Sequence, residues 1–238
     1  MFLADGSEFE GAAAAMPANL THLAIVGNAL PRRCGLATFT SDTVDAMRTR
    51  YPGLTVDHYA MDDDSGVAYP GDVRTIAADD PRAYREAAGL IEASGAQAIW
   101  LQHEFGIFGG EAGAHVLSLI ERSTLPLIVT VHTVLDAPSD SERFVLDRLL
   151  ARAAHVVVMA DIGRGILAKV YGVADSKVTV IAHGVPDRPQ VDPDSVKAAF
   201  GLTGRKVVMT FGLLGPDKGV RHMVEAMPAI VAAAPDAY

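Results

Sequence analysis

The sequence has a single cysteine and no long hydrophobic segment. Cys34 is the one cysteine among 238 residues, so the chain cannot form an internal disulfide. No apolar run reaches the roughly 20 residues that a helix needs to cross a bilayer. The first 20 residues also lack the basic start and the long apolar core of a secretion signal. These absences predict a cytoplasmic protein without membrane-spanning helices, and they leave room for a peripheral contact with a membrane.

Positive charge is also scarce. The chain carries 20 lysines and arginines against 29 aspartates and glutamates, for a formal net charge of -9, and it has no dense basic stripe. Nucleic-acid backbones attract basic surfaces, so we expect no nucleic-acid partner and favour a small-molecule ligand. Half of the residues are hydrophobic, which is enough for one large domain, or for one domain and the beginning of another.

Short runs rich in valine and isoleucine alternate with segments of helical spacing. The runs predict buried strands at residues 22–28, 54–60, 97–102, 126–132, 155–160, 177–182 and 206–211. The helical spacing predicts helices at residues 35–50, 80–94, 141–154 and 161–172. This alternation predicts an α/β fold with a Rossmann-like, doubly wound parallel sheet, which binds ligands at the carboxyl ends of its strands.

Prolines and acidic residues at 184–195 interrupt the alternation and indicate a domain boundary. We therefore expect a flexible extension at residues 1–19, a Rossmann-like domain at 20–185 and a linker with a short helix at 186–200. Residues 201–238 contain only one predicted strand and one predicted helix. Such a unit cannot bury both faces of a sheet, so it is either an extra strand of the first sheet or an unfinished second domain that exposes apolar surface.

The first strand is followed by "GNALPRRCGLATF", a loop that opens a helix near Gly35. Free backbone N–H groups at a helix N-terminus suit a diphosphate or sugar hydroxyls. A plain capped turn accounts for the same residues, so both interpretations stay open. Gly27 and Gly35 are too far apart for the dinucleotide fingerprint, and Cys34 is expected to be a small packed thiol.

The segment "LQHEFGIFGG" (101–110) follows another predicted strand. Glu104 and His103 could exchange hydrogen bonds with hydroxyl groups, and Gly109 and Gly110 could let the backbone approach a ligand closely. The alternative is a helix-capping loop with one satisfied histidine. The concentration of unusual residues favours ligand contact.

Further polar residues follow other strands, namely His132, Asp161 and His183 with Gly184. Together with the 101–110 segment they suggest a polar crevice along one edge of the sheet. The strand-end side chains could in principle be zinc ligands, namely His103, His132 and His183 with Glu104 and Asp161. No short metal-binding spacing supports this, and we expect no metal site.

Several segments in order resemble glycosyltransferase family 4 of the GT-B fold: "PRRCGLATFT", "TVHTVLD", "VVVMADIGRGILAKVYGV", "KVTVIAHGVPD" and "TFGLLGPDKGVRHMVEAMPAI". The resemblance covers about residues 20–238. It implies two Rossmann-like domains, an acceptor side at 20–185 and the first strand and helix of a donor-binding domain at 201–238. It also implies retaining transfer of a hexose from a nucleotide-sugar donor to a carbohydrate or other hydroxyl acceptor, without a cofactor.

The resemblance also assigns roles to individual residues. It places Gly35 near the phosphates and sugar of the donor, His132 against the transferred sugar as the catalytic residue, and Lys218 against the diphosphate. Gly184 matches the hinge glycine, whereas His183 stands where the family usually has asparagine. Leu213 replaces an arginine, and leucine offers no charged fork to phosphate.

One family feature is absent from the sequence: no two glutamates have seven residues between them. In the family such a pair holds the donor sugar and ribose, so we expect a truncated enzyme. Two alternatives stay open. One is a non-catalytic sugar-binding remnant without the donor domain, and the other is a metal-dependent hydrolase that uses His103, Glu104 and His132.

Overall fold

The computed structural model describes residues 20–185, 189–212, 215 and 218–238. The extension predicted at 1–19, part of the predicted linker at 186–188, and Leu213 lie outside the described residues. The chain divides into two units, residues 1–183 and 184–238, close to the predicted boundary. None of the helices in the described ranges has the length and apolar character needed to cross a membrane.

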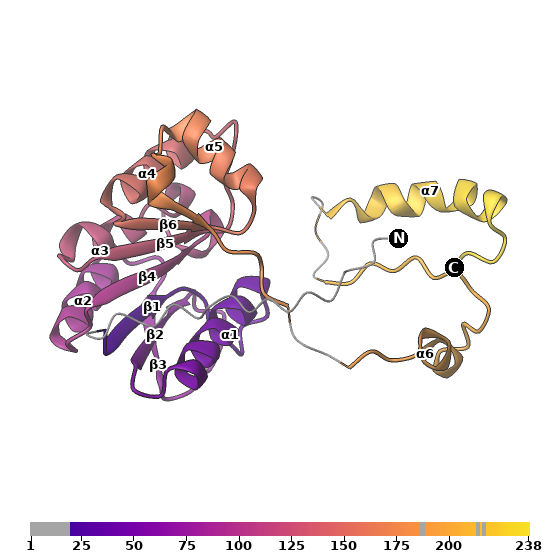
Figure 1. Cartoon of the computed structure of the whole chain (residues 1–238), viewed down its shortest axis with the longest axis horizontal. Helices are drawn as coiled ribbons and strands as arrows, with labels where there is room; N and C mark the ends of the chain where they lie inside the picture. The colour runs from indigo at the N-terminus through magenta and orange to yellow at the C-terminus, as the bar shows by residue number, and fades with distance from the viewer. Residues whose placement is uncertain (1–19, 186–188, 213–214, 216–217) are drawn as a thin grey trace. The chain divides into compact units, whose positions relative to one another are not determined.

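The N-terminal unit contains a parallel sheet with the strand order β3-β2-β1-β4-β5-β6-β7 (Figure 1). Its strands and helices, in chain order, are β1 (His22–Val26), α1 (Gly35–Arg50), β2 (Thr55–Asp62), β3 (Val73–Ala77), α2 (Pro81–Ala93), β4 (Ala98–His103), α3 (Val116–Arg122), β5 (Leu127–Val131), α4 (Asp140–Arg152), β6 (His155–Val158), α5 (Asp161–Tyr171) and β7 (Val178–Val180). Short 3₁₀ turns occur at Phe105–Ile107, Glu111–Gly113 and Asp175–Lys177. The predicted Rossmann-like α/β fold is confirmed.

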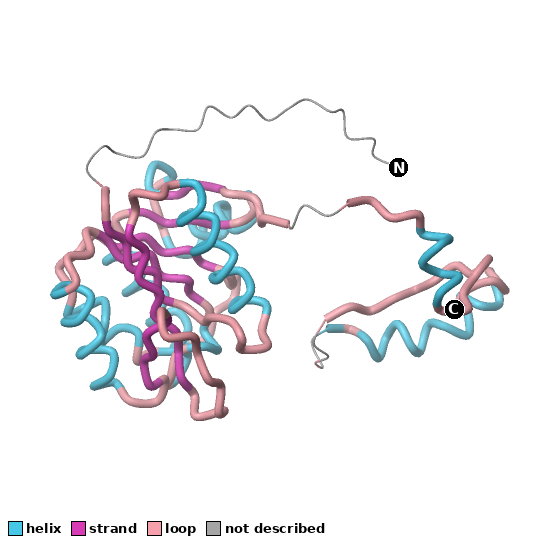
Figure 2. Tube along the Cα trace, turned by 90° about the horizontal axis from the view of Figure 1, so that it is seen from below, coloured by secondary structure: helices cyan, strands magenta, loops and turns pink. Residues whose placement is uncertain are grey.

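Hydrophobic side chains on both faces of the sheet form the core. Ile25 and Val56 belong to a smaller cluster that also includes Val44 of α1. Val26, the neighbour of Ile25 along β1, points into a larger cluster with residues of α2, α3 and α4. Successive side chains of a strand point to opposite faces, so both faces of the sheet are covered. Figure 2 shows the strands running between the helices.

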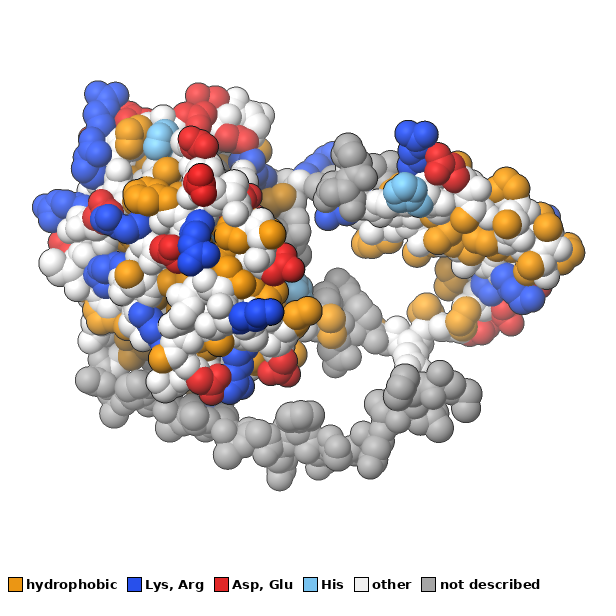
Figure 3. Space-filling view, turned by 90° about the horizontal axis from the view of Figure 1, so that it is seen from above, with side chains coloured by type: hydrophobic (Ala, Val, Ile, Leu, Met, Phe, Trp, Pro, Cys, Tyr) orange, Lys and Arg blue, Asp and Glu red, His pale blue; other side chains and the backbone are white. Residues whose placement is uncertain are grey.

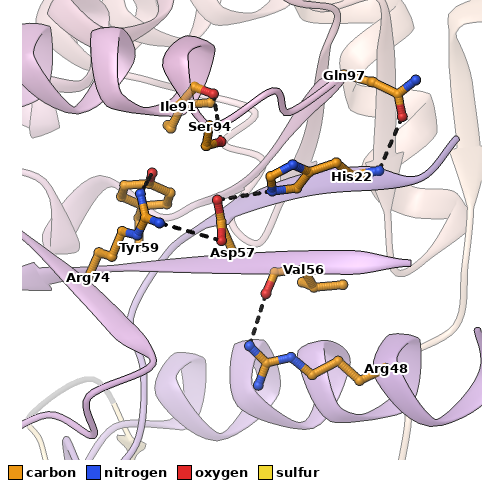
Figure 4. Close-up of polar contacts among 9 residues, drawn as sticks. All are labelled: His22, Arg48, Val56, Asp57, Tyr59, Arg74, Ile91, Ser94 and Gln97. Atoms are coloured by element: carbon orange, nitrogen blue, oxygen red, sulfur yellow. Dashed lines mark hydrogen bonds and ion pairs between the residues drawn. The ribbon is translucent and has the colours of Figure 1, made fainter. Parts of the chain in front are cut away.

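Polar contacts join β1, β2 and β3 near the amino ends of these strands (Figure 4). His22 Nε2 lies 3.0 Å from Asp57 Oδ2, and Arg74 Nη2 lies 3.9 Å from Asp57 Oδ1. Arg74 Nη1 also donates to the Tyr59 hydroxyl at 3.0 Å. Arg48 of α1 donates to the Val56 carbonyl at 2.9 Å, which fastens this helix to β2.

Two strands differ from the prediction. Strand β3 was not predicted, because "VRTIA" is an edge strand with mostly exposed side chains and lacks a continuous apolar run. Helix α3 follows the glycines at 106–110, where a helix was expected without bounds, and it has only seven residues, most of them buried. The strand predicted at 206–211 does not form. Within the described part of this segment, Lys206 makes an isolated parallel bridge to Ala237.

The C-terminal unit contains α6 (Pro193–Ala199) and α7 (Val220–Ala233). Ala237 is the only hydrophobic residue that is buried among those described in this unit. Met209 and Phe211 are 74% and 92% exposed, and Figure 3 shows hydrophobic side chains over this unit. The predicted exposure of apolar surface is confirmed.

Exposed apolar side chains at 206–211 should make the purified chain self-associate. We expect light scattering to give an apparent mass above 25.1 kDa that rises with protein concentration. The double variant Met209→Lys/Phe211→Lys should lower this mass toward that of a monomer. Leu90→Lys changes an exposed leucine of α2 in the other unit and is the matched control, which should leave association unchanged. A monomeric native chain at every concentration contradicts the prediction.

Candidate functional site

The parallel register brings residues from distant parts of the sequence to the carboxyl edge of the sheet. Gln102 of β4 pairs with Thr130 of β5, so His132 follows two residues beyond this pair, just past the end of β5. The backbone N–H of His132 donates to the His103 carbonyl at 3.0 Å. Gln102 and His132 therefore point to the same face of the sheet, which is the face covered by α1.

His132 lies in a cluster of polar and aromatic side chains. Its Nε2 is 3.0 Å from Gln102 Oε1. The Phe39 ring of α1 meets the His132 ring edge-on, with 4.8 Å between centroids, and meets the His183 ring at 5.1 Å. Two of the predicted strand-end histidines, His132 and His183, are thus brought together by a phenylalanine that sequence reasoning did not single out.

Burial controls the charge of His132. Loss of hydration, with a smaller contribution from His183, lowers the pKa of His132 to about 4. The imidazole is therefore neutral at neutral pH. A neutral imidazole has one nitrogen that donates and one that accepts a hydrogen bond, which suits contact with a hydroxyl group.

Helix α1 begins beside this cluster, because Phe39 lies one helical turn after Gly35. Cys34 is the N-cap residue, and its Sγ accepts hydrogen bonds from Ala37 N at 3.2 Å and from Asn28 Nδ2 at 3.3 Å. Gly35 is exposed, and a Cβ atom at this position would meet nothing within 4 Å. The packed-thiol interpretation of Cys34 agrees with these contacts. The open space around Gly35 leaves the start of the helix accessible.

A pocket of about 160 Å³ adjoins His132 between the ends of β5 and β6 and the first turns of α5. The rest of its lining is mostly apolar and includes Val134, Met159 and Ile162. The pocket can therefore hold a small group in contact with His132.

The sequence of the chain matches a family model over this same region. The model is that of Glycosyltransferase Family 4, and it matches residues 35–188. The chain belongs to glycosyltransferase family 4. No curated protein matches the chain. The family match begins at Gly35 and spans every element that forms the His132 cluster.

Glu104 lies close to this cluster in the family 4 domain. Its Oε2 accepts a hydrogen bond from Thr133 Oγ1 at 2.6 Å, and its Oε1 accepts one from Phe105 N at 3.0 Å. The carboxylate thus joins the loop after β4 to the loop after β5. This is the helix-capping role that the sequence left open, and contact with a substrate hydroxyl stays a prediction.

His103 is placed differently from His132. Its side chain is fully buried on the opposite face of the sheet, against the rings of Phe105 at 4.9 Å and Phe108 at 6.0 Å. Neither ring nitrogen has a hydrogen-bond partner among the described residues. Successive side chains of β4 point to opposite faces of the sheet, so the His103 side chain points away from Gln102 and His132. The structure gives His103 a packing role, and its predicted substrate contact has no support from this geometry.

Gly109 and Gly110 are also explained by packing. A Cβ atom at Gly109 would lie 2.0 Å from the Ala78 carbonyl oxygen, and one at Gly110 would lie 2.7 Å from the His115 ring. Gly110 has a φ of 79°, which favours glycine. Close approach of the backbone was predicted at both positions. In the structure the backbone at these glycines approaches Ala78 and His115 of the same chain, and contact with a ligand stays a prediction.

The remaining predicted residues are exposed at strand ends or in the C-terminal unit. Asp161 is the first residue of α5. Gly184 opens the C-terminal unit, and Lys218 lies shortly before α7, with its backbone N–H bonded to Gly215 O at 3.1 Å. Their roles toward substrate stay predictions. In the described ranges no three histidine, cysteine, aspartate or glutamate side chains could hold a metal ion, so His103, Glu104 and His132 do not form the site that a metal-dependent hydrolase needs.

Phe39 and Thr133 are the contacts that sequence reasoning missed. Phe39 is four residues after Gly35, so helical spacing predicts that both lie on the same face of α1. Thr133 directly follows His132. Their partners come from other elements of the fold, however, and neither residue carries a signal of its own in the sequence.

Gly109→Ala should destabilise the protein. Its Cβ has no room beside the Ala78 carbonyl, and overpacking of this kind costs about 1–3 kcal/mol. We expect a lower free energy of unfolding in urea denaturation. Gly106→Ala is the matched control, because a Cβ at Gly106 would meet nothing within 4 Å. Equal stability of the two variants contradicts the packing role of Gly109.

His103 should make stability depend on pH. Burial, followed by the charge of His132, lowers the pKa of His103 from 6.5 to about 3. The unfolded chain therefore binds a proton that the folded chain resists, and the free energy of unfolding falls as the pH drops below 6.5. The loss continues down to about pH 3 and amounts to about 2 kcal/mol by about pH 5.

His103→Phe keeps an aromatic ring at this position and removes the titrating group. Its stability, measured by urea denaturation at about pH 7 and about pH 5, should fall by about 2 kcal/mol less than that of the native chain. His222→Phe, at an exposed position of α7, is the control. The same decline in His103→Phe and in the native chain argues against a neutral buried His103.

Proposed function

We propose that this family 4 chain is the acceptor-side part of a hexosyltransferase. The enzyme moves a sugar from a nucleotide-sugar donor to a hydroxyl group of a carbohydrate or other acceptor, with retention of anomeric configuration. Family membership supports the reaction class. The observation that carries the proposal is the neutral His132, held by Gln102 and Phe39 beside the accessible start of α1.

Each proposed role follows from the chemistry of the residue. His132 is the proposed catalytic residue, and it lies against the transferred sugar and exchanges a hydrogen bond with a hydroxyl. The backbone N–H groups at Gly35 and the ammonium group of Lys218 neutralise charge on the leaving diphosphate. In the transfer, the bond between the sugar and the diphosphate breaks, and the acceptor oxygen forms the new bond and releases its proton. We assign no protein group as the base and propose no cofactor.

Contacts with the acceptor are proposed for the loops after β4 and β6. Glu104 is the best placed of these residues, because its carboxylate adjoins Thr133, the neighbour of His132. The loop that carries Glu104 is supported by the packing of His103, Gly109 and Gly110. Asp161 is exposed at the start of α5. Gly184 serves as the hinge between the units.

A second candidate function is sugar binding without turnover. It is favoured by the C-terminal unit, where Ala237 is the only buried hydrophobic residue among those described. A donor pocket needs a packed wall, and the described residues there bury little apolar surface. The same chain would then bind a sugar at His132 and leave a nucleotide-sugar intact.

Binding of sugars can be measured by titrating the chain with glucose, mannose, UDP-glucose and GDP-mannose. The native chain should bind at least one of these probes. His132→Ala should weaken that binding about 3- to 10-fold, because one hydrogen bond is lost. The control variant His155→Ala changes a histidine at the amino end of β6, away from the carboxyl ends of the strands. It should bind the probes as the native chain does.

Release of the nucleoside diphosphate distinguishes the two candidates. Consumption of a nucleotide-sugar supports the transferase, whereas sugar binding without consumption supports the binding module. Both candidates fail if no probe binds, or if His132→Ala binds with unchanged affinity.

A further inference from the structure

The contact between His132 and Gln102 determines which nitrogen of the imidazole carries the proton. His132 Nε2 lies 3.0 Å from Gln102 Oε1. In this orientation of the amide, Gln102 Oε1 can only accept a hydrogen bond, so His132 Nε2 is the donor, and Gln102 Nε2 has no hydrogen-bond partner among the described residues. In a neutral imidazole the other nitrogen, Nδ1, is then left with a free lone pair.

We infer that Gln102 is a positioning residue that holds His132 in the Nε2–H tautomer, so that Nδ1 accepts a hydrogen bond from a substrate hydroxyl. The role of Gln102 is indirect, because it acts through the imidazole. This inference rests on the proposed function only for the identity of the hydroxyl, which would belong to the transferred sugar or to the acceptor.

Gln102 is held firmly enough to impose this choice. It lies in β4, between β1 and β5, and its side chain is fully buried. Gly27 at the end of β1 makes room for it, because a Cβ atom at this position would lie 2.9 Å from Gln102 Cβ and 3.3 Å from Gln102 Cγ. The Thr40 hydroxyl borders the same space, since it would lie 3.1 Å from that Cβ atom. The side chain of Gln102 therefore has little freedom to move away from His132.

The surroundings of His132 keep its imidazole neutral, and only a neutral imidazole has two tautomers. Phe39 meets the ring edge-on, and the titratable group that acts on the imidazole is His183 after β7. A histidine supplies no negative charge that would stabilise an imidazolium. The carboxylate of Glu104 in the adjacent loop accepts hydrogen bonds from the Thr133 hydroxyl and from the backbone N–H of Phe105.

The tautomer has a consequence for recognition. A lone pair at Nδ1 attracts the hydrogen of a hydroxyl group and repels the oxygen of a phosphate, which carries no proton to donate. His132 would therefore select the sugar part of a nucleotide-sugar, and the diphosphate would have to be held elsewhere. Gln102, which touches no substrate, would in this way contribute to specificity.

Nuclear magnetic resonance of the histidine rings tests the inference without a ligand. Long-range proton–nitrogen spectra of the ¹⁵N-labelled 238-residue chain at about pH 7 distinguish the two tautomers. The signals of His132 are identified by their loss in His132→Phe. We expect a protonated Nε2, an unprotonated Nδ1, and an Nε2–H proton that exchanges slowly with water.

Two variants of Gln102 separate positioning from packing. Gln102→Met has a similar length but no acceptor, and exchange of the Nε2–H proton should become at least roughly 10-fold faster, as expected from the loss of about 1.4 kcal/mol of hydrogen bonding. Gln102→Glu keeps an acceptor, retains the Nε2–H tautomer and should raise the pKa of His132 by roughly 1–3 units, because a carboxylate stabilises the imidazolium.

Thr130→Val is the matched control. It removes the hydrogen bond from Trp100 Nε1 to Thr130 Oγ1, which joins the same two strands at 2.9 Å, and should leave the His132 signals unchanged. The inference is overturned by an Nδ1–H tautomer in the native chain, or by slow Nε2–H exchange that persists in Gln102→Met. If Gln102→Met does not fold, an unchanged His132 pKa in Gln102→Glu overturns it. No sugar is present, so failure of the proposed transferase activity leaves these outcomes unaffected.

Discussion

The pairing of β4 with its two neighbours is the constraint on which the candidate site depends. Hydrogen bonds to β1 and β5 hold Gln102 in a fixed register, with Gly27 against its Cβ atom and the ring of His132 at its amide oxygen. A shift of one residue in this register would exchange Gln102 for His103 on the face of α1. The hydrogen-bond partner of His132 would then be lost, although every residue of the sequence would be unchanged.

Burial accounts for the chemistry of the site. Removal from water lowers the pKa of both His103 and His132, but their surroundings differ. The His103 side chain packs against the rings of Phe105 and Phe108 in the core. His132 has a polar partner, an aromatic neighbour and a pocket beside it. Two neutral histidines at the ends of adjacent strands thus differ in their surroundings, because one points into the core and the other points toward α1 beside the ends of the strands.

Much of the fold could be predicted because the relevant signals are local. Helix α1 occupies the predicted residues 35–50, and six of the seven predicted strands form. The failures have physical causes. Strand β3 is exposed at the edge of the sheet and lacks an apolar run. Residues 206–211 have such a run, but a strand needs partners, and in the described residues the bridge from Lys206 to Ala237 is isolated.

The sequence by itself determined the alternation of strands and helices, the family, and the position of His132 after a buried strand, since these depend on apolar periodicity and on the order of motifs. Only the tertiary structure decided that Phe39 lies between His132 and His183, that Gln102 rather than His103 meets the His132 ring, and that Gly109 packs against Ala78. These contacts join residues that are distant in the chain. Strand register and the alternation of side chains between faces set them, and neither is written in any short stretch of residues.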